Sequence, residues 1–250
     1  MGYYPVTGFW VISLHSLLRH WRMALVLAIV AVWSPWSVFV QGPDVGAPPF
    51  GVMVLVPTHQ RAVALTFDDG PSPRTTTKIL SLLMSFHDQA TFFILGSQAA
   101  KYPKLTQLIV KDGMELGNHT YGHINLTQHS LTQDVADLTR TNHIIQQLTH
   151  RTPHWLRPPY GAYSTKVLHA AAECGLHLVL WTPGFVPVEN QDPSQLVSNV
   201  VKHLAPGEII PLPESGPRVA EEMGALFILL HDLKTLGYRS VTVSALARMH

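Results

Sequence analysis

Short apolar runs alternate with longer amphipathic stretches along most of this chain. The apolar runs begin near seven positions, each separated from the next by a segment long enough for a helix: Val63, Ala90, Glu115, Leu156, Leu176, Glu208 and Ser240. This alternation is typical of strands joined by helical crossovers, which build a parallel sheet. We therefore predict an α/β fold in which strand-end side chains gather at one mouth. These side chains are Asp68, Asp69, His119, Arg157 and Trp181.

Helical spacing is clearest in three stretches, at about 131–148, 164–174 and 219–236. In the last of them, apolar residues recur three and four positions apart, at Ala225, Leu226, Leu229, Leu230, Leu233 and Leu236. This spacing predicts an amphipathic helix with one apolar face.

A separate apolar run without charge extends from 23 to 40 and follows Arg19, His20 and Arg22. It is long enough to span a bilayer, and its basic flank predicts that the chain after 41 is exported. A cleaved signal peptide is the alternative, but no small-x-small cleavage site follows the run, which favours an anchor. We expect a basic-flanked segment at 1–22, the anchor or signal at 23–40, a Gly/Pro-rich linker at 41–57 and one folded domain at 58–250. The domain would be membrane-anchored outside the cytoplasm, or secreted or periplasmic.

Composition and charge narrow the possible partners. The 250 residues are 46% hydrophobic and 13% charged, with a net charge of +1. No Lys/Arg cluster provides the electrostatic footprint of nucleic-acid binding, so we expect no such partner. The single cysteine, Cys174, excludes an internal disulfide, and its place before Gly175 suggests a small buried side chain.

Two adjacent carboxylates end the first apolar run, in the sequence TFDDGP at 66–71. Neighbouring side chains on a strand point in opposite directions, so Asp68 and Asp69 are suited to different tasks. Two like charges this close favour a cation beside them. Turn capping is the simpler alternative, because Asp-Gly-Pro is common in turns.

Two histidines follow in GNHTYGH at 117–123. If the segment is helical, His119 and His123 share a face at a spacing that suits a divalent metal. Two imidazoles and one carboxylate leave positions open for water and substrate, as catalytic sites require. Chance is the alternative, because the chain has 15 histidines.

A rigid loop, LRPPYGAY at 156–163, lies between two of the predicted helices. Its Arg157 is placed to orient a carboxylate base through a bidentate contact. Pro159 leaves Tyr160 with the next free backbone N–H, which is suited to an oxyanion.

With these segments in this order, the chain resembles the polysaccharide deacetylase family, or NodB homology domain, of metal-dependent carbohydrate esterases. The resemblance covers about 52–246 and includes ATFFILG at 90–96, GMELG at 113–117, CGLHLVLW at 174–181 and LGYRSVT at 236–242. It implies a distorted (β/α)7 barrel that removes N-acetyl groups from an amino-sugar polysaccharide or oligosaccharide.

The resemblance also implies roles for individual residues. Asp68 would be the general base, oriented by Arg157, and the Tyr160 N–H would be an oxyanion donor. Tyr160 and Leu212 would contact the substrate. The ligands of a divalent metal, most often zinc in this family, would be Asp69, His119 and His123.

Two departures from the family pattern concern acids. The family usually places an acid after the strand ending at Trp181 to brace the motif arginine, whereas this chain has TPGFVPVE at 182–189. Glu189 or Asp192 is the available substitute. The last motif, which in the family ends in His-Asp, is here GEIIPLPE at 207–214, with Pro213 in place of the general-acid histidine. Pro211 is expected to disturb that strand. Without the acid, we expect slow catalysis.

The string LLHD at 229–232 copies the missing motif, but we interpret it as a coincidence. Making His231 the acid would remove the helix predicted at 219–236. Two interpretations of different class therefore remain open: an envelope-anchored N-deacetylase, possible despite Pro213, and a catalytically silent relative that binds metal and glycan. A third is an O-acetyl esterase, whose alkoxide leaves more easily than an amine.

Overall fold

The computed structural model describes residues 51–185, 192–214 and 218–249, apart from the side chain of Pro213. All of them belong to the second of two compact units, 38–250. The segments expected at 1–22 and 23–40, and the linker as far as residue 50, lie outside the described residues. Within the described residues, no helix is both long and apolar enough to cross a bilayer.

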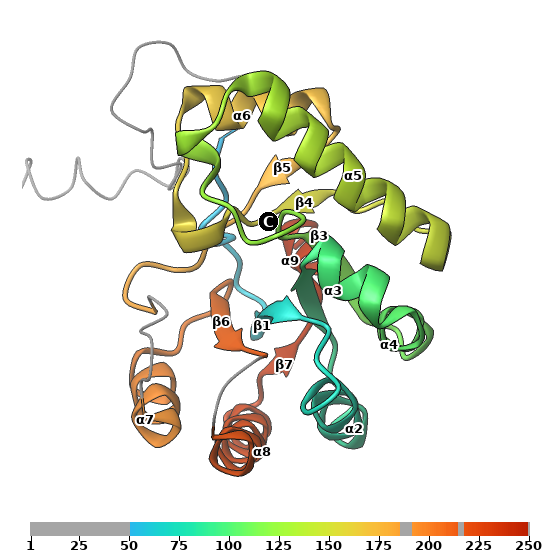
Figure 1. Ribbon diagram of the computed structural model, residues 1–250. Helices are drawn as coiled ribbons and strands as arrows, with labels where there is room; N and C mark the ends of the chain where they lie inside the picture. Colours follow the sequence, from blue (N-terminus) through green and yellow to red (C-terminus); the bar gives the residue numbers. More distant parts are fainter. Residues whose placement is uncertain (1–50, 186–191, 215–217, 250) are drawn as a thin grey trace, which may run out of the picture. The chain divides into compact units, whose positions relative to one another are not determined.

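A curled parallel sheet of seven strands forms the centre of the unit, with helices along its outer side (Figure 1). Its strands follow the order β5-β4-β3-β2-β1-β6, and β7 pairs with the first residues of β1. The strands are β1 (Ala62–Gly70), β2 (Ala90–Ile94), β3 (Glu115–Asn118), β4 (Trp155–Leu156), β5 (His177–Leu178), β6 (Ile209–Pro213) and β7 (Arg239–Ser240). All seven predicted strands are therefore confirmed, as is the parallel β/α architecture.

Helices connect the strands in the predicted positions. They are α2 (Thr76–Ser85), α3 (Gly96–Lys101), α4 (Pro103–Lys111), α5 (Leu131–Thr149), α6 (Thr165–Glu173), α7 (Pro193–His203), α8 (Val219–Thr235) and α9 (Val243–Ala247), with 3-10 turns η1 (Leu126–Gln128) and η2 (Pro159–Gly161). Local sequence explains several starts. Ser130 and Gln133 form a capping box at α5, and Ser164 caps α6 by accepting a hydrogen bond from the Val167 N–H.

The gap between β5 and β6 is bridged by the segment that precedes β1. The Met53 N–H donates to the Leu178 carbonyl at 3.0 Å, and the Val56 N–H donates to the Gly207 carbonyl at 2.9 Å. Val52, Val54 and Val56 are buried. Residues 51–57, which we expected in the linker, are thus part of the folded domain, because alternate valines of this segment pack into the core.

β1 is buried along most of its length and positions the site. Its residues from Ala62 to Phe67 are buried, and it pairs with β2 on one side and β6 on the other. Phe67 stacks on Phe92 with ring centroids 5.0 Å apart. Burying such a side chain contributes about 1.5–3 kcal/mol, so the core fixes the strand end that carries the two aspartates.

Pro211 does not disturb its strand, contrary to our expectation. β6 runs through it to Pro213 in parallel register with β1, pairing Thr66 with Pro211 and Asp68 with Pro213. The reason is position: β6 is the edge strand of the described sheet, and proline is tolerated where one side of a strand needs no ladder partner.

Candidate metal and catalytic site

The predicted clustering of strand-end side chains is confirmed. β1, β3 and β4 are parallel, so Asp69, His119 and Arg157 come from the same edge of the sheet. Trp181, shortly after β5, lies beside them, with its ring centroid 5.7 Å from the Arg157 guanidinium carbon. Four separate stretches of sequence thus supply one site.

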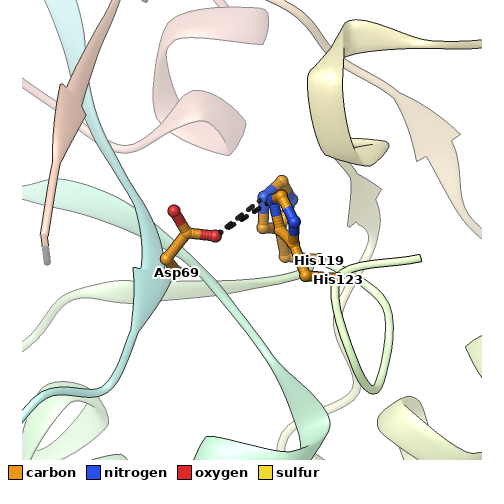
Figure 2. Close-up of side chains that lie close together, drawn as sticks. All are labelled: Asp69, His119 and His123. Carbon is orange, nitrogen blue, oxygen red and sulfur yellow. Dashed lines mark ion pairs between the residues drawn. The ribbon is translucent and has the colours of Figure 1, made fainter. Parts of the chain in front are cut away.

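Asp68 and Asp69 face different partners, as expected, but by a different backbone route. The register between β1 and β2 shifts between Asp68 and Gly70, and Asp69 has a φ of 73°. This left-handed conformation is uncommon for residues other than glycine, although aspartate tolerates it better than most. It directs Asp69 toward the two histidines (Figure 2). Asp68 faces Arg157 instead.

His119 and His123 lie together in a loop and not on a helix, which corrects the helical interpretation. His119 follows β3 directly, and the loop then turns back through Thr120 and His123, whose φ values are 68° and 60°. The Nε2 atoms of His119 and His123 lie 3.5 Å and 3.3 Å from Asp69 Oδ1. The turn, rather than helical spacing, brings the two imidazoles onto one carboxylate.

The far side of each imidazole is also engaged. His119 Nδ1 lies 2.6 Å from the Arg157 carbonyl oxygen, which requires Nδ1 to donate and leaves the Nε2 lone pair toward Asp69. His123 Nδ1 lies 3.2 Å from the Tyr160 hydroxyl. Such outer partners fix ring orientation at metal sites.

These residues fit a divalent metal. Asp69, His119 and His123 each offer one ligand atom, and the three atoms lie within 4.8 Å of one another. Asp69 Oδ1 is buried and makes no hydrogen bond among the described residues. A buried carboxylate oxygen without a donor, facing two imidazole nitrogens, is a donor set that suits a divalent metal.

Charges in the site favour a cation. Burial acts to raise the pKa of Asp69, but the nearby imidazoles of His119 and His123 bring it below its usual value. Burial acts to lower the pKa of His119, but Asp69 and Asp68 raise it overall. Burial keeps the pKa of His123 below its usual value. The carboxylates therefore stabilise positive charge at this point.

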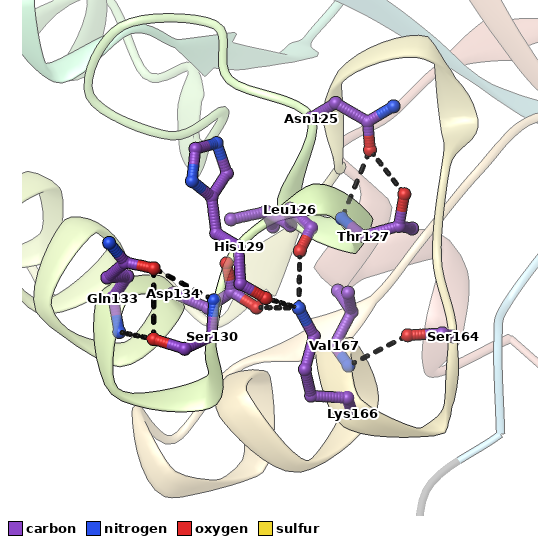
Figure 3. A network of polar contacts seen from close by, with 10 residues as sticks. All are labelled: Asn125, Leu126, Thr127, His129, Ser130, Gln133, Asp134, Ser164, Lys166 and Val167. Atoms are coloured by element: carbon purple, nitrogen blue, oxygen red, sulfur yellow. Dashed lines mark hydrogen bonds and ion pairs between the residues drawn. The ribbon is translucent and has the colours of Figure 1, made fainter.

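The loop that follows His123 is held by a polar network (Figure 3). Lys166 Nζ, from α6, donates to the carbonyls of Leu126 (2.7 Å) and His129 and pairs with buried Asp134 at 2.9 Å. The network joins α5, α6 and the loop, so it restrains the chain just after the two histidines.

Arg157 is fully buried and contacts Asp68 through one nitrogen, not through the bidentate contact that we expected. Its Nη1 donates to Asp68 Oδ1 at 2.9 Å and to Thr66 Oγ1 at 2.7 Å, and its Nη2 donates to the Leu180 carbonyl. Nε makes no hydrogen bond among the described residues. The pKa of Arg157 is lowered by burial, against the effect of Asp68.

Of the two suggested replacements for the missing brace, Asp192 does not contact Arg157. Asp192 is exposed and caps α7, accepting a hydrogen bond from the Ser194 N–H at 2.8 Å. Glu189 lies outside the described residues. The unpartnered Nε is where such an acid would be expected to bind.

Tyr160 lies at the rim of the site, with 69% of its surface exposed. Its φ of 63° places it in the left-handed region inside η2, and its N–H makes no hydrogen bond among the described residues. The hydroxyl contact to His123 was not predicted from the sequence. The proposed oxyanion and substrate contacts of Tyr160 stay predictions.

Two other assignments concern the strand end of β6 and helix α8. Leu212 is only 8% exposed and packs in the hydrophobic core with Phe67, so its substrate contact stays a prediction that depends on a small exposed part. His231 lies on α8 and is exposed, which confirms the helix predicted there. It does not stand at a strand end.

Sequence reasoning missed Glu214, although the alignment of 207–214 with the last family motif placed an acid there. It is fully buried next to the end of β1, and its N–H lies 3.3 Å from the Asp68 carbonyl. Burial raises the pKa of Glu214 to about 7, against the effect of hydrogen bonds from Thr76 and Ser72.

Comparison with known proteins agrees with this geometry. The sequence profile of the family described as polysaccharide deacetylase matches residues 56–179. A peptidoglycan-N-acetylglucosamine deacetylase of Bacillus cereus is 35% identical over 198 residues, which cover 77% of this chain and 91% of the relative. The chain belongs to the polysaccharide deacetylase family. This deacetylase-family protein is accordingly a hydrolase that acts on carbon–nitrogen bonds other than peptide bonds.

Other relatives broaden the picture of the family. A chitooligosaccharide deacetylase of Bradyrhizobium is 34% identical over 159 residues, which cover 63% of this chain and 72% of the relative. Among solved structures, a mutant of a CE4 family pseudoenzyme with restored enzymatic activity has a TM-score of 0.72 and 25% identity, covering 82% of this chain and 75% of that chain. The wild-type pseudoenzyme comes from Bacillus anthracis.

Proposed function

We propose that this protein is a zinc-dependent N-deacetylase of an amino-sugar polymer of the cell envelope, with peptidoglycan as the first candidate substrate. The observation that carries the proposal is the set of Asp69, His119 and His123 ligand atoms within 4.8 Å of one another, beside an Asp68 held by Arg157. The similarity to a peptidoglycan-N-acetylglucosamine deacetylase supports the choice of substrate.

In this proposal, Asp69, His119 and His123 hold the metal. A divalent metal at such a site polarises the acetyl carbonyl and makes water a better nucleophile. Asp68 accepts the proton of the attacking water, because the hydrogen bond from Arg157 holds its carboxylate in place. The Tyr160 N–H donates to the oxyanion that forms on the acetyl carbonyl.

Collapse of the tetrahedral species requires a proton for the leaving amine. Pro213, in register with Asp68, has no proton to give. The amine must then take its proton from water or from the newly protonated Asp68. General acid catalysis contributes typically ~10²–10⁴-fold, so we expect slow amide hydrolysis.

Pro213 also favours a second candidate, a silent relative that binds metal and glycan without turning it over. Support comes from the pairing of Pro213 with Asp68, which puts a residue without an ionisable group beside the base. Between the two, the hydrolase explains more of the site, because binding alone gives no physical reason for an Asp68 side chain held by a buried Arg157.

Location follows from the N-terminal sequence. The uncharged run at 23–40 with its basic flank supports an anchor that leaves the domain outside the cytoplasm, with a secreted or periplasmic form if the run is cleaved. Protease digestion of intact cells and of spheroplasts would test it. Protection of the domain in spheroplasts would contradict export.

The test of function is acetate release by the full-length chain, kept in mild detergent because of the apolar run, with zinc or with a chelator. N-acetylglucosamine oligomers, peptidoglycan and an O-acetylated glycan are compared. Chelator-sensitive release from the first two supports the N-deacetylase, and release from the O-acetylated glycan alone supports the esterase. Stoichiometric zinc binding without release from any of them supports the silent relative, whereas absence of zinc binding contradicts the metal site.

A further inference from the structure

Glu214 lies directly after β6, at the point where β6 meets the end of β1. Its side chain is fully buried, so it does not contact a polymer bound at the mouth of the site. Its backbone N–H donates to the Asp68 carbonyl at 3.3 Å. The residue that follows the replaced general acid is therefore attached to the backbone of the general base.

The carboxyl group of Glu214 joins the turn after β1 to the start of α2. Its Oε1 accepts a hydrogen bond from the Thr76 hydroxyl, and the Ser72 N–H lies 3.3 Å from the same oxygen. The Thr76 hydroxyl also accepts from the Ser72 N–H at 2.8 Å. Thr76 is the first residue of α2, so this one carboxyl group ties the turn after β1 to the start of that helix.

Gly70 shows how closely this carboxyl group approaches the turn. A Cβ at position 70 would lie 1.6 Å from Glu214 Oε2 and 2.3 Å from its Cδ, and the three nearest atoms all belong to Glu214. Gly70 does not have a left-handed φ, unlike Asp69 before it. Glycine is thus required at position 70 by the Glu214 side chain and not by the backbone conformation.

Asp69 lies between the two points that Glu214 contacts. Its φ of 73° and the register shift around it are what separate the directions of Asp68 and Asp69. A single non-glycine residue in this region is unfavourable unless its surroundings hold it. We propose that Glu214 is a positioning residue, which holds 68–70 so that Asp68 faces Arg157 while Asp69 faces the two histidines. This inference rests on the proposed metal-dependent function.

The first test is the zinc dissociation constant of the full-length apoprotein in detergent. Glu214→Ala should raise it ~10–100-fold, the range for partners that orient metal ligands. Glu214→Gln should bind zinc nearly as well as the wild type, because its amide oxygen still accepts from Thr76 and Ser72.

The matched control is Asp88→Asn. Asp88 is also buried, but it pairs with Lys234 at 2.9 Å. It precedes β2 and so lies at the amino-terminal end of the strands, opposite the site. The Asp88→Asn variant should have a lower Tm and an unchanged zinc affinity. If Glu214→Ala behaves in the same way, Glu214 is only structural and the proposal is overturned.

A second test does not depend on zinc. Gly70→Ala should lower Tm because its Cβ overlaps the Glu214 carboxyl group, and Gly70→Ala/Glu214→Ala should recover part of that loss. A double variant no more stable than Gly70→Ala would contradict the proposal that Glu214 holds this turn. If the wild type binds no zinc, the proposed metal function fails, and this Tm cycle still decides whether Glu214 holds the turn.

Discussion

The carboxyl ends of β1, β3 and β4 differ sharply from the end of β6. The first three supply Asp68, Asp69, His119 and Arg157, each engaged by a charged or polar partner. The end of β6 supplies Pro213 opposite Asp68, and a glutamate that is buried away from solvent. The groups proposed to bind a metal and activate water thus come from other strands than the position where the family places its general acid. One set can be lost while the other is kept.

The largest effect is expected from changes at the strand ends that supply the aspartates, His119 and Arg157. Asp68→Asn removes the proton acceptor but leaves Asp69 and both histidines, so acetate release should fall ~10²–10⁴-fold with zinc affinity unchanged. Activity assays and zinc titration of the same preparation measure both quantities.

Asp69→Asn is the control for that prediction. It removes a metal ligand, so zinc affinity should fall by more than the roughly 100-fold expected for outer partners, and acetate release should be lost with it. An Asp68→Asn protein with wild-type activity would remove Asp68 from the role of base.

The stability of the β6 end should depend on pH in a defined direction. The folded-state pKa of Glu214 is raised to about 7 from an ordinary 4.5, so the folded protein binds this proton more tightly than the unfolded chain. This contribution is complete below pH 4.5 and is lost as the pH rises through 7, which lowers the free energy of unfolding by up to about 3 kcal/mol.

Denaturant unfolding across that pH range, compared with Glu214→Gln, measures the effect. The variant should lack this part of the slope, since its amide does not titrate. The difference between the two proteins separates the pH dependence due to Glu214 from that due to the site histidines, which both proteins share. Parallel curves for the wild type and the variant would contradict the assigned pKa.

Restoring an acid at the end of β6 should speed amide cleavage. Pro213→His puts an imidazole in register with Asp68, and turnover of an N-acetylglucosamine oligomer should rise, at most by the ~10²–10⁴-fold that general acids provide. Release from an O-acetylated glycan should change less, because an alkoxide leaves with less help. An equal gain on both substrates would argue against a missing acid.

The smallest effect is expected at the rim. Tyr160→Phe removes the hydroxyl that lies 3.2 Å from His123 Nδ1 but keeps the ring, which packs against the imidazole with centroids 4.8 Å apart. We expect zinc affinity to fall about 10-fold, the lower end for outer partners. Isothermal titration with zinc measures it, and unchanged affinity would show that the hydroxyl does not orient His123.

The strands and the main helices were predictable because their signals are local. Apolar runs and helical spacing found β1 through β7, and Ser130 and Ser164 mark the starts of α5 and α6. The gathering of His119 and His123 was predicted for the wrong local reason. Their turn depends on Thr120 and His123 in left-handed conformations, which residue spacing does not reveal.

Contacts that cross the fold were less accessible from sequence. The role of Glu214 depends on its reach to Gly70 and Thr76, which lie far away along the chain. The tolerance of Pro211 depends on β6 being at an edge, which only the strand order tells. Whether Arg157 contacts Asp68 through one nitrogen or two depends on the rotamers of both side chains, which the sequence does not specify.

The bridging segment at 52–56 has a mechanical consequence. It comes before β1 in the chain and is bonded to Leu178 on one side and Gly207 on the other. Tension applied from the N-terminal side of the domain therefore loads these short bridges before it reaches the strand that carries Asp68 and Asp69. The hydrogen bonds to Leu178 and Gly207 would break first, so the strand end that carries Asp68 and Asp69 would keep its geometry under that force.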